Sequence, residues 1–125
     1  MPRRRSPTLT DAELRLMRVL WEKQSATVAE VVEALTGKPV LAYNTVLTIM
    51  RILDRKGYVA HEKTGRAFLY RPLIDQNHAR QSALRHLASR FFENSASLLV
   101  LNLLNDEQLD AGELKRLKKL IEEVP

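Results

Sequence analysis

The first part of the chain carries three amphipathic helical patterns followed by two β-prone runs, and this order constrains the fold more than any other feature. The first helix is predicted to begin after Thr10, with Glu13 three residues later, and the second after Thr27, with Glu30 three residues later. Each pair is a capping box, in which a hydroxyl and a carboxylate satisfy backbone amides at the helix end. We expect the second helix to end at Gly37, because glycine commonly follows the last helical residue.

The third helix is predicted to start between Ala42 and Asn44 and to end at Gly57. The two β-prone runs that follow flank Thr64–Gly65, which we expect to form the turn of a hairpin. Three short helices followed by a two-stranded hairpin describe a winged helix-turn-helix. The sequence therefore predicts a mainly α-helical chain with a small β-hairpin.

The third helix has two different faces. On a helical wheel, one stripe is apolar and would pack on the first two helices; it consists of Val46, Ile49, Met50 and Leu53. The opposite face begins with short hydrogen-bonding side chains and ends with guanidinium groups; it consists of Asn44, Thr48, Arg51 and Arg55. Leu47 lies on the edge of this second face, where we expect no packing partner for it.

This order of side chains is the one that a DNA major groove requires. The N-terminal part of a recognition helix reaches base edges, whereas flanking cations reach phosphates. Leu47 would then contact a thymine methyl group, and Lys63 and Arg66, beside the hairpin turn, would reach the backbone or the minor groove. The alternative is a polar face that is only solvated, but the helix-turn-helix order followed by a hairpin favours duplex DNA.

The distribution of charge agrees with a polyanionic partner for the first segment. The whole chain has a formal net charge of +5. Residues 1–74 hold 13 Lys and Arg against 7 Asp and Glu, which gives a net charge of +6. Residues 75–125 hold 7 Lys and Arg against 8 Asp and Glu, which gives a net charge of −1. We expect residues 1–8 to be a disordered basic arm. Arg3, Arg4 and Arg5 could contact DNA or could simply be a solvated tail.

Residues 75–125 form a second predicted domain, with helices at roughly 75–92, 95–104 and 110–123. The run "SLLVLNLL" is apolar nearly all round, which implies burial on every side. Three helices of this total length are marginal as an isolated domain, so we predict a two-fold homodimer; the alternative is that they fold back on the N-terminal segment of their own chain. The expected dimerisation residues are Leu84, Leu87, Phe91, Leu98, Leu99, Leu101, Leu114, Leu117, Leu120 and Ile121.

Several classes of function find no support in the sequence. The chain has no cysteine, so disulfides and thiolate sites are excluded. No stretch reaches the ~18 apolar residues of a membrane span, and the N-terminus does not have the pattern of a secretory signal; we expect a cytoplasmic protein. His61, His78 and His86 do not form a convincing metal set, and no catalytic motif is present. We expect neither an enzyme, nor a cofactor, nor a metal site.

From Leu9 onward the chain resembles the penicillinase-repressor family of winged-helix regulators. The resemblance lies in "LTDAELRLMRVLWEK", in "LAYNTVLTIMRILDRKGYVAHEKTGRAFLYRPL" and in "SLLVLNLLNDEQL", taken in this order and spacing. It implies a dimeric repressor that binds a palindromic operator in double-stranded DNA. The family's recognition-helix positions fall on Asn44, Thr45, Leu47 and Thr48, beside Tyr43, and its backbone-contacting positions fall on Arg51, Arg55 and Lys56.

The resemblance also implies how repression is relieved. A membrane-bound sensor metalloprotease controls cleavage within the dimerisation segment of family members, and the matching bond is Asn102–Leu103. Copper-responsive members sense metal through a cysteine cluster, which this chain does not have. Two other functions remain open: a winged-helix module that binds a protein, and a repressor controlled by a small ligand held between the two segments.

Overall fold

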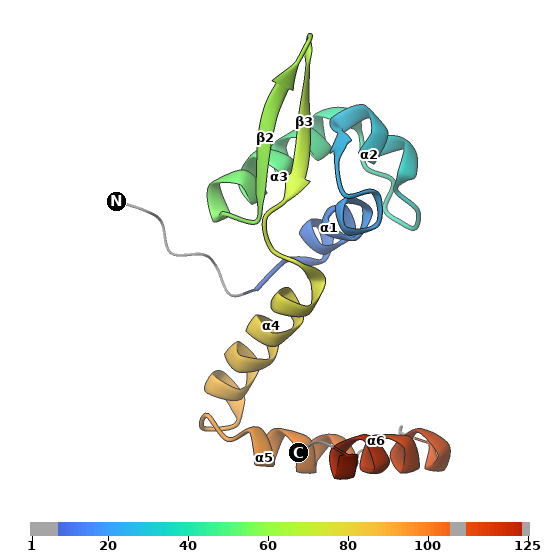
Figure 1. The fold of residues 1–125 in the computed structure, drawn as a ribbon, viewed down its shortest axis with the longest axis vertical. Helices are drawn as coiled ribbons and strands as arrows, with labels where there is room; N and C mark the ends of the chain where they lie inside the picture. The colour runs from blue at the N-terminus through green and yellow to red at the C-terminus, as the bar shows by residue number, and fades with distance from the viewer. Residues whose placement is uncertain (1–7, 106–109, 124–125) are drawn as a thin grey trace. The chain divides into compact units, whose positions relative to one another are not determined.

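The computed structural model describes residues 8–105 and 110–123 (Figure 1). One compact unit ends at Ala83 and a second begins at Leu84, so the division falls within a helix. The first unit therefore includes residues that the sequence analysis assigned to the second domain. Arg3, Arg4 and Arg5 lie outside the described residues.

The first unit contains three helices and a small sheet. Its elements are α1 (Asp11–Lys23), β1 (Ala26–Thr27), α2 (Val28–Ala34), α3 (Tyr43–Lys56), β2 (Val59–Thr64) and β3 (Ala67–Pro72). Helix α4 (Gln76–Phe91) begins in this unit and continues into the second, which also contains α5 (Ala96–Leu104) and α6 (Ala111–Glu123). The predicted mainly α-helical fold with a small β-hairpin is confirmed.

The helix ends follow their local sequence closely. Both capping boxes are present. The Thr10 hydroxyl accepts from the Glu13 amide and the Thr27 hydroxyl from the Glu30 amide, and each glutamate carboxylate accepts from the backbone amide of its threonine. Gly57 ends α3 in the left-handed conformation, as predicted. The prediction for the end of α2 was wrong. The helix stops at Ala34, and Leu35 takes an extended conformation that packs its side chain against the core.

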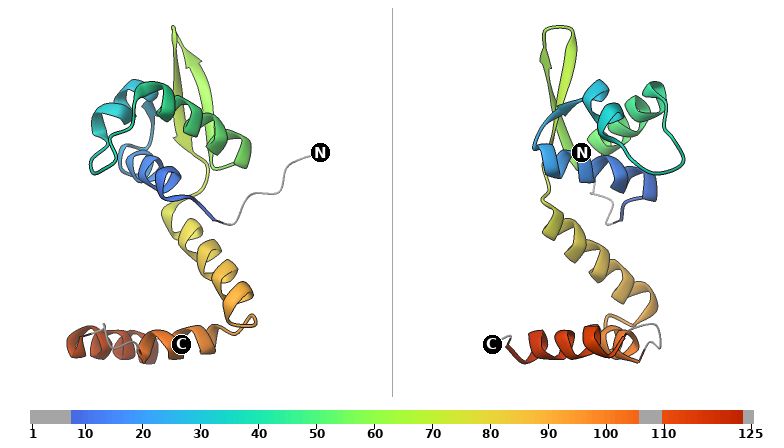
Figure 2. Two further views of the ribbon diagram at one scale, coloured as in Figure 1. Left: turned by 180° about the vertical axis from the view of Figure 1, so that it is seen from behind. Right: turned by 90° about the vertical axis from the view of Figure 1, so that its right-hand side faces the viewer.

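The sheet has three antiparallel strands in the order β1-β3-β2. Strand β1 was not predicted; it pairs Ala26 with Tyr70. Strands β2 and β3 form the predicted hairpin, which projects beyond the helices of its unit (Figure 2). Thr64 pairs with Ala67, so the turn consists of Gly65–Arg66 and not of Thr64–Gly65 as predicted. Gly65 has a φ of 65°, in the left-handed region that tight hairpin turns require.

The core of the first unit joins α1, α2, α3 and the sheet. The inward stripe of α3 is confirmed: Val46, Met50 and Leu53 are completely buried, and Ile49 packs against them while half-buried. Their buried partners include Leu16, Met17, Leu20, Val31, Tyr58, Val59 and Tyr70. This packing orients α3 so that its polar face remains outside.

The second unit leaves most of its apolar side chains exposed. Of its described residues only Ala88 and Leu99 are buried, and Phe91 is 67% exposed. The exposed apolar surface of α4 and α5, referred to below as the apolar face, consists of Leu84, Leu87, Phe91, Leu98, Val100, Leu101 and Leu103. Leu114, on α6, is half-buried. Leu117, Leu120 and Ile121 also lie on α6, but their side chains are outside the described part.

Candidate nucleic-acid interface

Helix α3 presents a continuous exposed polar face. The side chains of Asn44, Thr45, Thr48, Arg51 and Arg55 are all exposed, because the buried stripe occupies the other side of the helix. Tyr43, at the first position of the helix, is half exposed. Short hydrogen-bonding groups therefore lie at the N-terminal end of this face and guanidinium groups at its C-terminal end.

Thr48 has a hydrogen bond that limits what it can recognise. Its hydroxyl donates to the backbone carbonyl of Asn44, with 3.0 Å between the oxygens. Since the hydroxyl proton is used inside the helix, the outward lone pair can only accept a hydrogen bond. Thr48 is thereby suited to the amino group of adenine or cytosine in a major groove.

The expectation that Leu47 has no packing partner was wrong. Its side chain is half-buried and packs against the core of the first unit. The helical wheel placed it on the edge of the polar face, which is close enough to the apolar stripe for its side chain to join the core. Leu47 therefore has a structural role, and a thymine contact is not needed to explain it.

Lys56 makes a contact that the sequence did not predict. Its Nζ lies 2.8 Å from Glu13 Oε1, and the two side chains are 27% and 5% exposed. The same carboxylate oxygen accepts from the Thr10 amide at 2.8 Å. The ammonium group is thus used to join the end of α3 to the start of α1, and Lys56 does not extend outward as Arg55 does.

The carboxyl of Glu13 is ionised in this arrangement. Burial by itself would raise its pKa, but the hydrogen bonds from Lys56 and Thr10 and the charge of Lys56 together hold the pKa of Glu13 below its ordinary value. The charged pair therefore persists at neutral pH.

The hairpin carries two of the predicted cations at its tip. Lys63 lies near the end of β2 and Arg66 in the turn, and both are exposed. Closer to α3, His61 Nδ1 of β2 contacts the Asp54 carboxylate of α3, and the imidazole packs against Phe68, with 5.1 Å between the ring centroids. This contact connects the wing to the recognition helix.

The loop before α3 is held by an arginine that the sequence analysis did not identify. Arg15 of α1 donates from Nη1 to the carbonyl of Pro39, at 2.8 Å, and from Nη2 to the carbonyl of Thr36, at 3.1 Å. The sequence around Arg15 does not indicate this role, because the two carbonyls that it contacts are more than twenty residues away in the sequence.

The predicted cleavage site lies inside a helix. Asn102 and Leu103 are exposed residues of α5, and Asn102 Nδ2 donates to the carbonyl of Leu98 at 2.9 Å. Ser95 caps this helix by accepting from the Leu98 amide. A protease that cuts an extended backbone therefore requires local unwinding of α5.

Neither a membrane-spanning helix nor a metal-binding cluster is present among the described residues. None of the helices in residues 8–105 and 110–123 is long and apolar enough to cross a membrane. Within the same ranges, no group of three or more His, Cys, Asp or Glu side chains is placed to hold a metal ion.

The packed helices, the basic outward face of α3 and the projecting hairpin define a winged helix-turn-helix protein. The chain belongs to the penicillinase repressor family, whose model matches residues 9–123. This is a family of transcriptional repressors and not an enzyme class.

Similar proteins agree with this assignment. The penicillinase repressor of Bacillus licheniformis is 32% identical over 94% of this chain and 91% of its own length. The methicillin resistance regulatory protein MecI of Staphylococcus aureus (strain N315) is 21% identical over 90% of this chain and 92% of its own length. The solution structure of the DNA binding domain of the repressor BlaI superposes with a TM-score of 0.53 at 34% identity, covering 61% of this chain and 93% of that chain.

Proposed function

We propose that this protein is a homodimeric transcriptional repressor that binds a palindromic operator through α3 and the wing. Asn44, Thr45 and Thr48 read base edges, Arg51 and Arg55 contact phosphates, and Lys63 and Arg66 extend the contact along the backbone. The protein acts in the cytoplasm, where the DNA is. Because Lys56 is paired with Glu13 and Leu47 packs on the core, we assign them to the structure of the reading unit.

One observation carries this proposal: five polar side chains are exposed on a helix whose other side packs into the core, with Val46, Met50 and Leu53 completely buried. A helix held in this way by its core presents a rigid surface, which base recognition requires. The wing adds exposed cations and is connected to α3 through the contact of His61 with Asp54. The resulting surface combines hydrogen-bonding groups for base edges with cations for phosphates.

We propose that the apolar face of α4 and α5 forms the dimer interface together with α6. Large exposed apolar patches are unusual on monomeric proteins and mark surfaces that bind a partner. The apolar face contains a leucine or phenylalanine at six of its seven positions. A second copy of the chain would cover these side chains and hold two recognition helices at the spacing of successive major grooves, about 34–36 Å or a multiple of it.

Cleavage at Asn102–Leu103 by a membrane-bound sensor metalloprotease would relieve repression. The cut would detach α6 and the end of α5 from the interface. The dimer would then lose the roughly 10²–10⁴-fold gain in avidity that two linked reading units provide.

The salt dependence of duplex binding tests the anchoring role of the arginines. For wild-type protein and the Arg55→Ala variant, affinity for a fixed duplex is measured over a series of salt concentrations. Each phosphate contact contributes about 0.9 to the slope of log affinity against log salt, so Arg55→Ala should flatten the slope by about that amount and weaken binding to all sequences alike. An unchanged slope would show that Arg55 does not contact a phosphate.

The dimer interface is tested by placing a charge on the apolar face. Phe91→Asp should convert the protein to a monomer in sedimentation and lower its affinity for a palindromic duplex, while affinity for a single half-site is kept. Ser89→Asp is the matched control, because it adds the same charge at another exposed position of α4. If Phe91→Asp remains a dimer, the apolar face is not the interface.

A further inference from the structure

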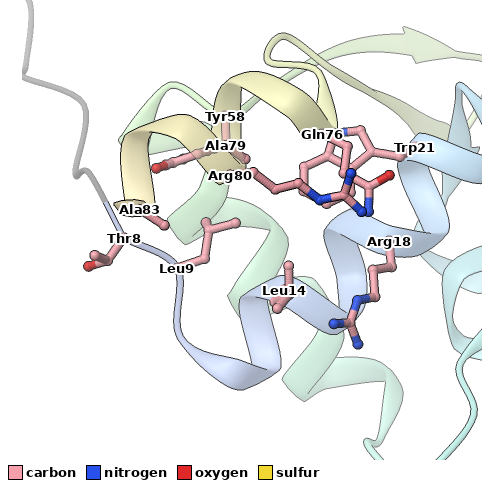
Figure 3. Close-up of a pocket in the computed structure, with 10 residues that line it drawn as sticks. All are labelled: Thr8, Leu9, Leu14, Arg18, Trp21, Tyr58, Gln76, Ala79, Arg80 and Ala83. Carbon is pink, nitrogen blue, oxygen red and sulfur yellow. The ribbon is translucent and has the colours of Figure 1, made fainter. Parts of the chain in front are cut away.

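The first unit contains a pocket between α1 and the beginning of α4 that is separate from the polar face of α3. Its volume is about 290 Å³. Figure 3 shows Gln76, Ala79, Arg80 and Ala83 of α4 facing Leu14, Arg18 and Trp21 of α1, with Leu9 at one end. This size is near the lower end of the range for pockets that hold small molecules, roughly 300–1,000 Å³.

The walls of this pocket are mainly apolar and aromatic. Leu9, Leu14, Ala79 and Ala83 contribute aliphatic groups, and Trp21 and Tyr58 contribute rings. The Trp21 ring is fixed in place, because its Nε1 donates to the carbonyl of Ile74 at 2.8 Å. The pocket thus offers a largely pre-formed surface to an aromatic or aliphatic group.

Two arginines supply the charge of the pocket. Arg80 extends from α4 toward Gln76 and Trp21, and Arg18 lies on the α1 side (Figure 3). Within the part of the chain that the structure describes, neither guanidinium group forms a hydrogen bond or an ion pair, and no acidic side chain lines the pocket. Guanidinium groups bind carboxylates through paired hydrogen bonds.

We propose that this pocket binds a small organic acid, with its apolar part between Trp21 and the aliphatic side chains and its carboxylate on Arg80. The apolar lining selects against inorganic anions, and the two cations select against neutral compounds of the same shape. Arg80 is the main partner of the carboxylate, and Arg18 adds to the positive electrostatic potential of the pocket from the opposite wall.

Such a ligand would be coupled to operator binding. Helix α4, which forms one wall of the pocket, continues into the second unit. A ligand that binds one arrangement of α4 on α1 more tightly than another shifts the population toward it, and thus changes the geometry available to the two reading units. This consequence rests on the proposed function, whereas the binding site itself does not.

Direct binding tests the site. The full-length protein is titrated with 3-phenylpropanoate at neutral pH while Trp21, the single tryptophan of the chain, is followed by fluorescence, and calorimetry is run in parallel. We expect a saturable change with this carboxylate and binding at least about tenfold weaker for the neutral 3-phenylpropan-1-ol, because a charge-assisted hydrogen bond is roughly twice as strong as a neutral one. Equal binding of the acid and the alcohol, or no saturation by the acid, would overturn the proposal.

Three variants locate the binding site. Arg80→Gln should weaken binding of the acid about tenfold, and Ala83→Phe should abolish binding by filling the pocket without altering its charge. Arg85→Gln is the control, because it removes the same charge from α4 outside the pocket and should leave the affinity unchanged. An equal loss in Arg80→Gln and Arg85→Gln would mean that only the general charge of the protein is sensed, and the proposed site would be wrong.

The regulatory consequence has its own readout. Operator affinity is measured with and without saturating 3-phenylpropanoate, in wild-type protein and in Ala83→Phe. A change in the wild type that is absent from Ala83→Phe supports the coupling. If fluorescence shows binding but operator affinity does not change, the coupling is wrong while the site stands; if no duplex is bound at all, it is the proposed function that fails.

Discussion

Replacing Lys56 by glutamine separates the structural cation at the end of α3 from its neighbour, the proposed phosphate contact Arg55. The variant leaves the carboxylate of Glu13, which is 4% exposed, without its partner. Removing one member of a fully buried ion pair costs about 3–5 kcal/mol, whereas exposed pairs contribute about 0.2–1 kcal/mol. Since Lys56 is partly exposed, we expect Lys56→Gln to lower the free energy of unfolding by about 2 kcal/mol at pH 7.

This loss should depend on pH in one direction. The pKa of Glu13 is held below its ordinary value in the folded state. A carboxyl of this kind stabilises the fold above its unfolded-state pKa, and this contribution disappears as the pH falls through the folded-state pKa. The difference between wild type and Lys56→Gln should therefore be complete at pH 7 and should shrink below about pH 4.

Urea unfolding followed by Trp21 fluorescence, at one protein concentration, measures these differences. Arg55→Gln is the matched control, since it removes the same charge from the same helical turn but from an exposed side chain; its stability should change by less than about 0.5 kcal/mol. The Glu13→Gln variant completes a double-mutant cycle with Lys56→Gln. Duplex binding should show the reverse order, with a larger loss of affinity in Arg55→Gln than in Lys56→Gln. Equal effects of the two variants on stability and on binding would refute the assignment.

Three further predictions concern other contacts of the first unit. Trp21→Phe removes the hydrogen bond to the Ile74 carbonyl and should lower the free energy of unfolding by about 1–2 kcal/mol, measured by thermal denaturation with circular dichroism. Arg15→Gln releases the two carbonyls of the loop before α3; operator affinity should fall severalfold while the melting temperature changes little, and unchanged affinity would show that the loop needs no such support. The Cβ of Gly65→Ala would meet no atom within 4 Å, but the alanine must adopt a φ of 65°. The variant should therefore lower the free energy of unfolding by about 1–2 kcal/mol, measured by urea unfolding. An unchanged stability would mean that the turn does not lie at Gly65.

The features that the sequence predicted correctly depend on residues close together in the chain. The capping boxes at Thr10 and Thr27 are local hydrogen bonds, and Gly57 ends α3 through its own conformation. The two faces of α3 follow from helical periodicity, so the outward position of Thr48 and Arg55 was predictable without a structure.

The errors and omissions depend on residues far apart in the chain. The hairpin register, and with it the Gly65–Arg66 turn, is set by the pairing of β3 with both β1 and β2. A two-residue strand such as β1 is too short for any periodic signal. Lys56 looked like another outward cation because its partner Glu13 lies on a different helix.

The second unit illustrates a different limit. The apolar run of α5 predicted burial on every side, but within one chain Leu101 and Leu103 are exposed. The sequence indicates that these side chains must be buried, but it does not show which surface covers them. A second copy of the chain meets this need in the proposed dimer, and sedimentation of Phe91→Asp against Ser89→Asp tests that step.

The central claim is that the polar face of α3 reads bases, and selection from a random duplex library tests it most directly. Wild-type protein and Thr48→Ala are each used to enrich binding sites, which are then sequenced. We expect the wild type to select a palindrome, and Thr48→Ala to lose base preference at one symmetric pair of positions while retaining it elsewhere. Identical enriched sites from the two proteins, or no enriched site from the wild type, would contradict the account.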